Sequence, residues 1–210
     1  MKVKECRKSE EKSPVKVKIC GLSRDVDIDY VNELQPDYIG FVFAKKSRRC
    51  VTPEHAAELK AKLDPRIPAV GVFRDAPAAL AAGLANHGVI DCIQLHGQED
   101  AAYLEGLRAL MSAPVIQAFV IRSADDVQHA LLSRADYLLF DGGAGNGVPF
   151  DWTLLRNVDR PFFLAGGLTP ENVTSAIEAC HPFAVDASSS LETDGVKDYR
   201  KIKRFIEAAS

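Results

Sequence analysis

Eight short hydrophobic runs recur along the chain, separated by longer amphipathic stretches. Most of the runs are nearly continuous rather than alternating, as expected of strands that are covered on both faces. They are also rich in β-branched and aromatic residues, which favour extended structure. The eight predicted strands span residues 15–19, 38–43, 69–73, 92–95, 115–120, 137–140, 162–164 and 183–185.

The stretches between the runs carry the spacing of amphipathic helices and are rich in alanine and leucine. Predicted helices cover 53–63, 77–87, 99–110, 124–132, 170–179 and 198–208, with a shorter one around 152–157. Thr52 and Thr169 each precede a proline, which predicts an N-cap followed by proline at the first helical position. Ser23 is a further N-cap candidate, directly after the first run.

Strand and helix patterns alternate about eight times, which predicts a parallel sheet with right-handed crossovers. Eight units favour a single-domain (β/α)8 barrel (a TIM barrel) over an open doubly wound sheet. No linker divides the chain, so residues 15–210 form one predicted barrel domain. Residues 1–14 are charged throughout and lack an apolar segment, so we expect a disordered or extended N-terminal segment and no secretory signal.

Composition narrows the class of protein. The net charge of −3 provides no basic field, so nucleic acid is not an expected partner. No apolar run approaches the roughly 18 residues of a membrane span. The five cysteines are odd in number, widely spaced and without a CxxC pair, which argues against a disulfide framework or a zinc site. A reducing, cytoplasmic location is therefore expected.

In a parallel barrel the active site lies where the strands end. The first run ends on Cys20, which is either an inert buried thiol or, at a barrel mouth near cations, a thiolate base. Asp141 follows the apolar sequence YLLF and is either a cap or loop ion pair, or a general acid whose pKa is raised by apolar surroundings. His96 directly follows the fourth run, but strand order gives no reason to pair it with Cys20. The glycines at 142, 143, 145 and 147 predict a flap over Asp141.

Two small-residue loops suit an anion. The segment AGGLTPEN (165–172) runs from a strand toward a helix, and DASSS (186–190) follows the last strand. Barrels often hold phosphate with the loops after strands 7 and 8, so we favour phosphate binding over a simple tight turn. Arg48 and Arg49 follow the second strand and either grip a carboxylate or phosphate or form a solvated basic turn.

Together these segments resemble the phosphoribosylanthranilate isomerase family of tryptophan biosynthesis. The matching motifs run in family order over nearly the whole chain. They are KICGLS (18–23), DYIGFVF (37–43), SRR (47–49), VGVF (70–73), IQLHG (93–97), LLFD (138–141), FDW (150–152), AGGLTPENV (165–173) and PFAVDASSSLE (182–192).

The resemblance implies a (β/α)8 barrel that converts N-(5-phosphoribosyl)anthranilate to 1-(2-carboxyphenylamino)-1-deoxyribulose 5-phosphate by an Amadori rearrangement. It assigns the general base to Cys20, the general acid to Asp141 and a contact with the anthranilate side to Arg49. It places the remaining substrate-binding positions at Gln94, His96, Gly166, Gly167, Asp186, Ser188, Ser189 and Ser190. It implies a phosphorylated small-molecule substrate, no cofactor or metal, and a monomer or homodimer.

Two departures from the family pattern stand out. Ser190 occupies a position where the family usually has glycine, and the loop after Asp141 is short. Two alternatives remain open: a histidine-pathway or dual-substrate phosphoribosyl isomerase, and a non-catalytic phosphosugar-binding barrel. The first would bring a second glycine pair in the N-terminal half, where the strand ends read FRDA and LHGQ. Retention of Cys20 and Asp141 argues against the second.

Overall fold

The structure, a computed structural model of the chain, describes residues 15–143 and 150–210. The expectations for residues 1–14, and for the part of the predicted flap that contains Gly145 and Gly147, lie outside the described residues.

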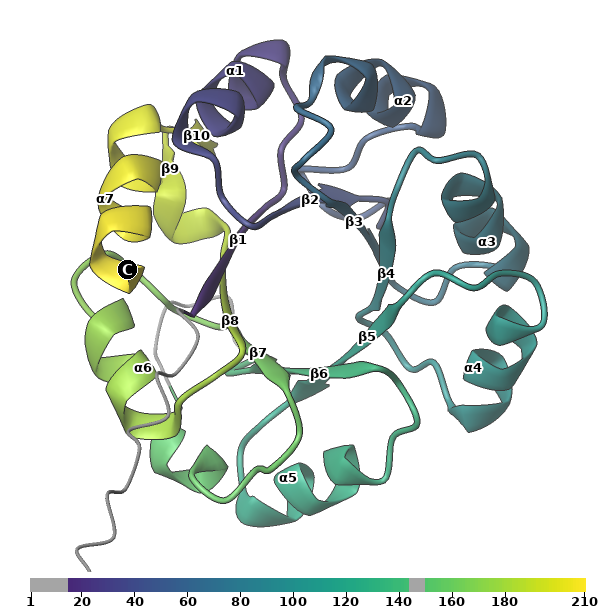
Figure 1. Cartoon of the computed structure of the whole chain (residues 1–210). Helices are drawn as coiled ribbons and strands as arrows, with labels where there is room; N and C mark the ends of the chain where they lie inside the picture. The colour runs from purple at the N-terminus through teal and green to yellow at the C-terminus, as the bar shows by residue number, and fades with distance from the viewer. Residues whose placement is uncertain (1–14, 144–149) are drawn as a thin grey trace, which may run out of the picture.

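Eight parallel strands close into a barrel in chain order, with the last strand pairing with the first (Figure 1). The predicted (β/α)8 barrel is confirmed, and each predicted run matches a strand to within one or two residues. The strands are β1 (Lys16–Cys20), β2 (Tyr38–Val42), β3 (Ala69–Phe73), β4 (Cys92–Leu95), β5 (Val115–Val120), β6 (Tyr137–Asp141), β7 (Phe162–Leu164) and β8 (Ala184–Ala187).

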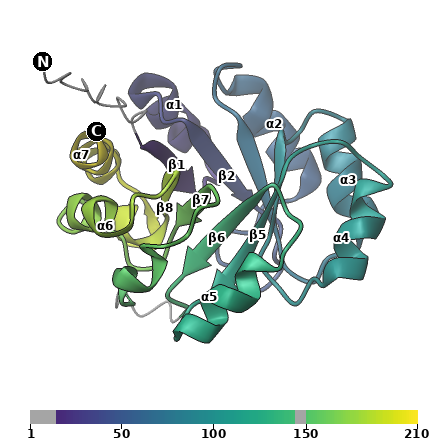
Figure 2. The same ribbon diagram turned by 60° about the horizontal axis from the view of Figure 1, so that its bottom comes forward.

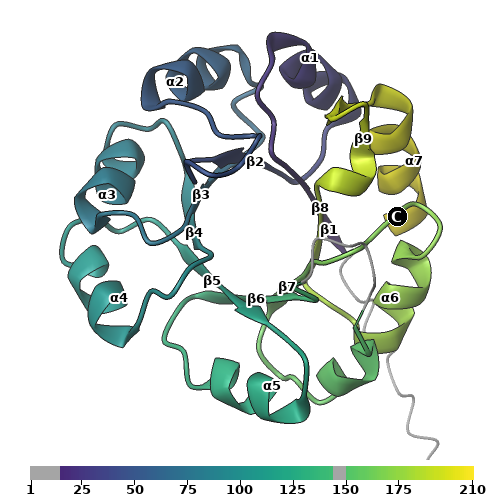
Figure 3. The same cartoon turned by 180° about the vertical axis from the view of Figure 1, so that it is seen from behind.

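Helices form a ring around the barrel, seen from its two ends in Figures 1 and 3. Each buries an apolar stripe against the strands; in α7 this stripe is Ile202, Phe205 and Ala209. Figure 2 shows α6 and α7 side by side near β8 and β1, where the barrel closes. The helices are α1 (Asp25–Leu34), α2 (Pro53–Lys62), α3 (Ala78–Asn86), α4 (Ala101–Arg108), α5 (Ala124–Leu131), the 3-10 helix η1 (Trp152–Leu155), α6 (Val173–Cys180) and α7 (Tyr199–Ala209). None of the helices in the described ranges is long and apolar enough to cross a membrane.

Alternation along the strands decides which side chains point into the barrel. Residues two apart on a strand share a face. Val70, Ile116, Leu139 and Phe163 form an apolar cluster inside the barrel. The residue two positions after Leu139 is Asp141, so it too points inward, one layer nearer the carboxyl ends of the strands. The same step leads from Cys92 to Gln94, from Ala184 to Asp186 and from Lys18 to Cys20.

The helix starts agree only in part with the expected caps. Thr52 caps α2 as predicted, because its side chain accepts the N–H of His55 at 3.2 Å. The prediction for Ser23 is wrong: α1 begins at Asp25, with Arg24 as its N-cap residue. The carboxylate of Asp27 accepts the N–H of Ser23 at 3.0 Å, so it fixes this turn from inside the helix.

The expected helix start at Thr169 is also wrong. Helix α6 begins at Val173, and its N-cap residue is Asn172. The Asn172 side chain accepts the N–H of Thr169 at 2.8 Å and donates to the carbonyl of Gly167 at 2.9 Å. These bonds hold residues 167–172 in a turn. The loop between β7 and α6 is therefore longer than its sequence suggested.

A short hairpin follows β8 that the hydrophobic pattern did not reveal. After the 3-10 turn η2 (Ser189–Leu191), β9 (Glu192–Thr193) pairs antiparallel with β10 (Val196–Lys197). The connecting residues Asp194 and Gly195 both have positive φ, 52° and 83°, as a two-residue hairpin turn requires. The pairing places Glu192 directly opposite Lys197.

Candidate active site

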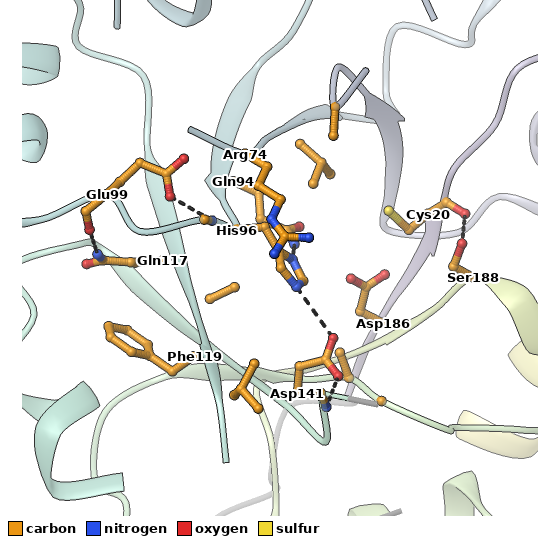
Figure 4. Close-up of a pocket in the computed structure, with 18 of the residues that line it drawn as sticks. Cys20, Arg74, Gln94, His96, Glu99, Gln117, Phe119, Asp141, Asp186 and Ser188 are labelled. Carbon is orange, nitrogen blue, oxygen red and sulfur yellow. Dashed lines mark hydrogen bonds and ion pairs between the residues drawn. The ribbon is translucent and has the colours of Figure 1, made fainter. Parts of the chain in front are cut away.

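A cavity of about 1550 Å³ opens at the carboxyl ends of the strands. All the residues proposed from the sequence as catalytic or substrate-binding line it: Cys20, Arg49, Gln94, His96, Asp141, Gly166, Gly167, Asp186, Ser188, Ser189 and Ser190. Figure 4 shows several of them pointing into it from different strands. Since these residues span the chain from the first strand to the last, it is closure of the barrel that assembles them.

Cys20, the last residue of β1, is buried at the mouth of the barrel. Burial raises the pKa of its thiol, and the positive charge of Lys18 opposes this shift. Lys18 is fully buried, and its Nζ lies 2.8 Å from Oδ2 of Asp186. The negative charge of Asp186 raises the pKa of Lys18 despite burial, so this lysine remains a cation beside the thiol.

Two buried oxygen atoms in the cavity are left without a partner. Asp186 uses Oδ2 for Lys18, while its Oδ1 has no hydrogen bond among the described residues. The Oε1 atom of Gln94 is likewise unpaired in the described part of the chain. Buried acceptors normally find a donor, so these two suit a ligand that carries hydroxyl groups.

Asp141 ends β6 and reaches the cavity from a different side than Cys20 (Figure 4). Its Oδ1 accepts the N–H of Gly143 at 2.8 Å, and its Oδ2 lies 3.6 Å from Nε2 of His96. Nδ1 of His96 lies in turn 3.0 Å from the amide nitrogen of Gln94. His96 therefore lies beside Asp141.

Glycines make the close approach of the β6 and β7 ends possible. Gly166 and Gly167 have φ of 87° and 69°, in the left-handed region that favours glycine. A Cβ atom on Gly166 would lie 2.4 Å from the backbone nitrogen of Gly142 and 2.8 Å from Oδ1 of Asp141. The first glycine of the loop thus sets the position of the carboxylate as well as the loop's own path.

Gly166→Ala is expected to lower kcat/KM about tenfold or more, because the methyl group would displace Asp141 from its place. Gly88→Ala is the matched control. Gly88 also has positive φ, 71°, but no heavy atom lies within 4 Å of a Cβ placed there. Both variants should lose stability, which thermal unfolding would measure, whereas only Gly166→Ala should lose activity. Equal turnover in the two variants would contradict the steric role of this position.

The serine loop after β8 tolerates its departure from the family pattern. Ser190 lies within η2, and the described residues with positive φ do not include it. A serine there therefore meets no left-handed strain. Ser188 donates its hydroxyl to the carbonyl of Cys20 at 2.9 Å, which ties this loop to the end of β1.

Sequence reasoning assigned no role to several charged residues in and around the site. Arg49 lines the cavity as expected, but its guanidinium is already paired with Glu192, with 3.0 Å between Nη2 and Oε2. Arg74, directly after β3, also lines the cavity and has no hydrogen bond or ion pair among the described residues. The sequence did hold one usable signal, because Asp-Gly between short β-prone segments marks a hairpin and so predicts the pairing of Glu192 with Lys197. Lys18 gave none, since a lysine within a strand reads as exposed.

A closed parallel barrel that gathers a thiol, a carboxylate and two glycine- and serine-rich loops at one mouth has the layout of a (β/α)8-barrel enzyme. Comparison with known proteins specifies it further. The sequence model of the N-(5'-phosphoribosyl)anthranilate isomerase family matches residues 17–208, and the chain belongs to this family. The resemblance seen in the motifs is thereby confirmed.

Individual relatives agree over almost their full length. The N-(5'-phosphoribosyl)anthranilate isomerase of Streptococcus mutans is 45% identical over 197 residues, which cover 92% of this chain and 97% of the relative. The phosphoribosylanthranilate isomerase structure from Thermotoga maritima is 37% identical, with a TM-score of 0.84 over 93% of this chain and 98% of that one. A phosphoribosylanthranilate isomerase in complex with reduced 1-(o-carboxyphenylamino)-1-deoxyribulose 5-phosphate is also 37% identical, with a TM-score of 0.83 and the same coverage.

Proposed function

We propose that this chain catalyses the Amadori rearrangement of N-(5-phosphoribosyl)anthranilate to 1-(2-carboxyphenylamino)-1-deoxyribulose 5-phosphate, a step of tryptophan biosynthesis. The observation that carries the proposal is the cavity that brings Cys20 and Asp141 together with the glycine and serine loops of β7 and β8. Family membership and the product analogue bound to a solved relative support the same chemistry.

The substrate is an anion at both ends, and the site offers each end a different partner. The phosphate lies against Gly166 and Gly167 and the serines 188–190, where backbone N–H groups and hydroxyls are close at hand. The aromatic carboxylate lies toward Arg49. Between these ends, the unpaired acceptor oxygens of Asp186 and Gln94 take hydroxyl groups of the sugar.

The first chemical step needs an acid at the ribose ring. Asp141 in its protonated form delivers a proton to the ring oxygen, the bond from that oxygen to C1 breaks, and a Schiff base forms with the anthranilate nitrogen. His96 lies beside this carboxyl group, with Nε2 3.6 Å from Oδ2.

The second step needs a base on another side of the sugar. The Cys20 thiolate removes the proton from C2 of the Schiff base, which gives an enolamine. The enolamine then gains a proton at C1 and loses one from the C2 hydroxyl, which leaves the ketone of the product. Only protons and electron pairs move, so one acid and one base account for the whole rearrangement.

A coupled fluorescence assay that follows the loss of phosphoribosylanthranilate tests the proposal directly. Turnover by the purified chain is the expected result. Tight binding of the product analogue without turnover would instead support a non-catalytic phosphosugar-binding barrel. Turnover of the bis-phosphorylated aminoimidazole substrate of the histidine pathway would support the other alternative.

Arg74→Ala is expected to raise KM about threefold to tenfold and to change kcat less, because it removes an unpaired cation from the mouth that receives a multiply charged anion. Initial-rate kinetics at two salt concentrations would show this, and the effect should shrink at high salt. Arg66→Ala, which removes an exposed arginine paired with Asp64 just before β3 begins, is the control and should leave KM unchanged. Similar KM values for the two variants would argue against a role for Arg74.

The proposal includes a reducing, cytoplasmic setting and an assembly no larger than a homodimer. Cys20 acts as a base only while it is not oxidised, and the cysteines of the described residues are all free. A solved Thermotoga maritima structure is of monomers generated from a dimeric phosphoribosylanthranilate isomerase. Analytical ultracentrifugation would determine the state of this chain.

A further inference from the structure

One buried carboxylate at the edge of the cavity serves three cations. Glu192, the first residue of β9, has only 3% of its side chain exposed. It pairs with Arg48, with Arg49 through Nη2 at 3.0 Å and with Lys197 through Nζ at 2.9 Å. Lys197 is itself buried, with 1% of its side chain exposed.

The charges of this cluster do not balance. Arg48 is 58% exposed and does not line the cavity, so the inner part of the cluster sets Arg49 and Lys197 against one carboxylate. One positive charge is left in excess there. The paired cations lower the pKa of Glu192 despite burial, so its side chain stays ionised. Buried ion pairs add little stability compared with apolar residues of the same size. The excess positive charge on the inner part of this cluster is better explained by an anionic ligand than by stability.

The contacts of the cluster extend to the residues proposed to bind both anionic groups of the substrate, its carboxylate and its phosphate. On one side Glu192 holds Arg49, which lines the cavity. On the other side Lys197 binds the carbonyl of Ser188 at 2.9 Å and its hydroxyl at 3.3 Å. The Ser188 hydroxyl then donates to the carbonyl of Cys20.

The two sets of contacts from Glu192, one to Arg49 and one through Lys197 to Ser188, are called here its two arms. They meet at Gly21. A Cβ atom there would lie 2.4 Å from Cδ of Arg49 and 3.1 Å from Oγ of Ser188. Its φ of 82° is also in the left-handed region. The glycine after Cys20 therefore lets Arg49 and Ser188 approach each other over the end of β1.

We propose that Glu192 is a positioning residue that sets both anion contacts at once. It orients Arg49 toward the aromatic carboxylate and, through Lys197, holds Ser188 in place for the phosphate. The hairpin of β9 and β10 is the device that presents Glu192 and Lys197 to the two arms. This inference rests on the proposed function, because it takes the ligand to be an anion at both ends.

Calorimetry with two probes measures the contribution of each arm to binding affinity separately. The first probe is the reduced product analogue, which carries a carboxylate and a phosphate; the second is the same molecule without the ring carboxylate. Arg49→Met should weaken only the first probe, about tenfold for a lost charge-assisted contact. Lys197→Met should weaken both probes by a similar factor, about tenfold. Glu192→Gln should match Lys197→Met on the second probe and exceed it on the first.

The control removes another cation-paired carboxylate, one that does not line the cavity. Asp136, which precedes β6, accepts from Arg108 at 2.9 Å and from the N–H of Val115 at 2.7 Å. Asp136→Asn should leave both affinities unchanged even where it lowers the unfolding temperature. In steady-state kinetics Glu192→Gln should raise KM by a larger factor than it lowers kcat, which a merely structural residue would not do.

Wild-type affinity of Glu192→Gln for both probes would overturn the inference, as would a loss confined to the first probe. If that variant fails to fold, wild-type affinity of Lys197→Met for the second probe overturns it equally. The proposed function has a separate test. A wild-type chain that binds both probes without converting phosphoribosylanthranilate contradicts the proposed function alone, whereas one that turns over while Glu192→Gln binds normally contradicts this inference alone.

Discussion

Cys20→Ala is expected to lower kcat by about 10²- to 10⁴-fold, the usual contribution of a positioned general base. The variant retains Asp141, so ring opening to the Schiff base can still occur. The alanine side chain, however, cannot remove the proton from C2. Affinity for the product analogue should change little, since Arg49 and the loops proposed to bind phosphate are untouched. Single-turnover and steady-state assays with the phosphoribosylanthranilate substrate would measure the effect.

The control for this prediction is a second buried thiol. Cys180 lies at the end of α6, and its Sγ contacts the carbonyl of Ala176 one turn earlier. Cys180→Ala removes the same atom and leaves a similar gap, yet it should retain full activity. Near-normal turnover of Cys20→Ala would exclude the thiol as the base.

The buried position of Cys20 also predicts a pH dependence. Burial raises the pKa of the thiol, so at neutral pH the smaller part of the free enzyme holds the thiolate. On the alkaline side of neutrality the thiolate fraction of Cys20 should therefore rise with pH until the thiol is fully ionised. Lys18→Met removes the cation that favours the thiolate, so it should shift this rise to higher pH. The ultraviolet absorbance of the thiolate, titrated in wild type and Cys20→Ser, would assign the transition to this residue.

The fold could be predicted because its information is local. A strand buried on both faces shows as a short apolar run, and repetition of that run eight times determines the barrel. The predictions were wrong at two helix starts, where a nearby side chain hydrogen-bonds the backbone of an irregular turn and so fixes the first helical residue. Asp27 replaced Ser23 in fixing the start of α1, and Asn172 delayed the start of α6 beyond Thr169.

The site could be located but not completed from the sequence. Topology brings all strand ends to one mouth, so residues at those ends could be grouped without knowing any contact. The pairs that organise the mouth are long-range instead. Lys18 and Asp186 are 168 positions apart, and Arg49 and Glu192 are 143 apart. No periodicity joins such residues; only closure of β8 against β1, and the hairpin beyond it, brings them together.

Asp141→Asn is expected to reduce kcat by about 10²- to 10⁴-fold, through loss of the general acid. The amide has nearly the shape of the carboxyl group and can still accept the N–H of Gly143, so the loop should keep its path. It cannot deliver a proton to the ring oxygen, and the substrate remains in its closed form. Asp91→Asn is the control, because Asp91 accepts the N–H of Ala69 and pairs with Lys60 just before β4, at the opposite end of the barrel.

Substrate deuterated at C2 distinguishes the two catalytic variants by the step that each one slows. In Cys20→Ala the removal of this proton limits the rate, so deuteration should slow turnover further. In Asp141→Asn the earlier ring opening limits the rate, and deuteration should have little effect. A large isotope effect in Asp141→Asn together with none in Cys20→Ala would reverse the two assignments, because the order of ring opening and proton removal is fixed by the chemistry of the Schiff base.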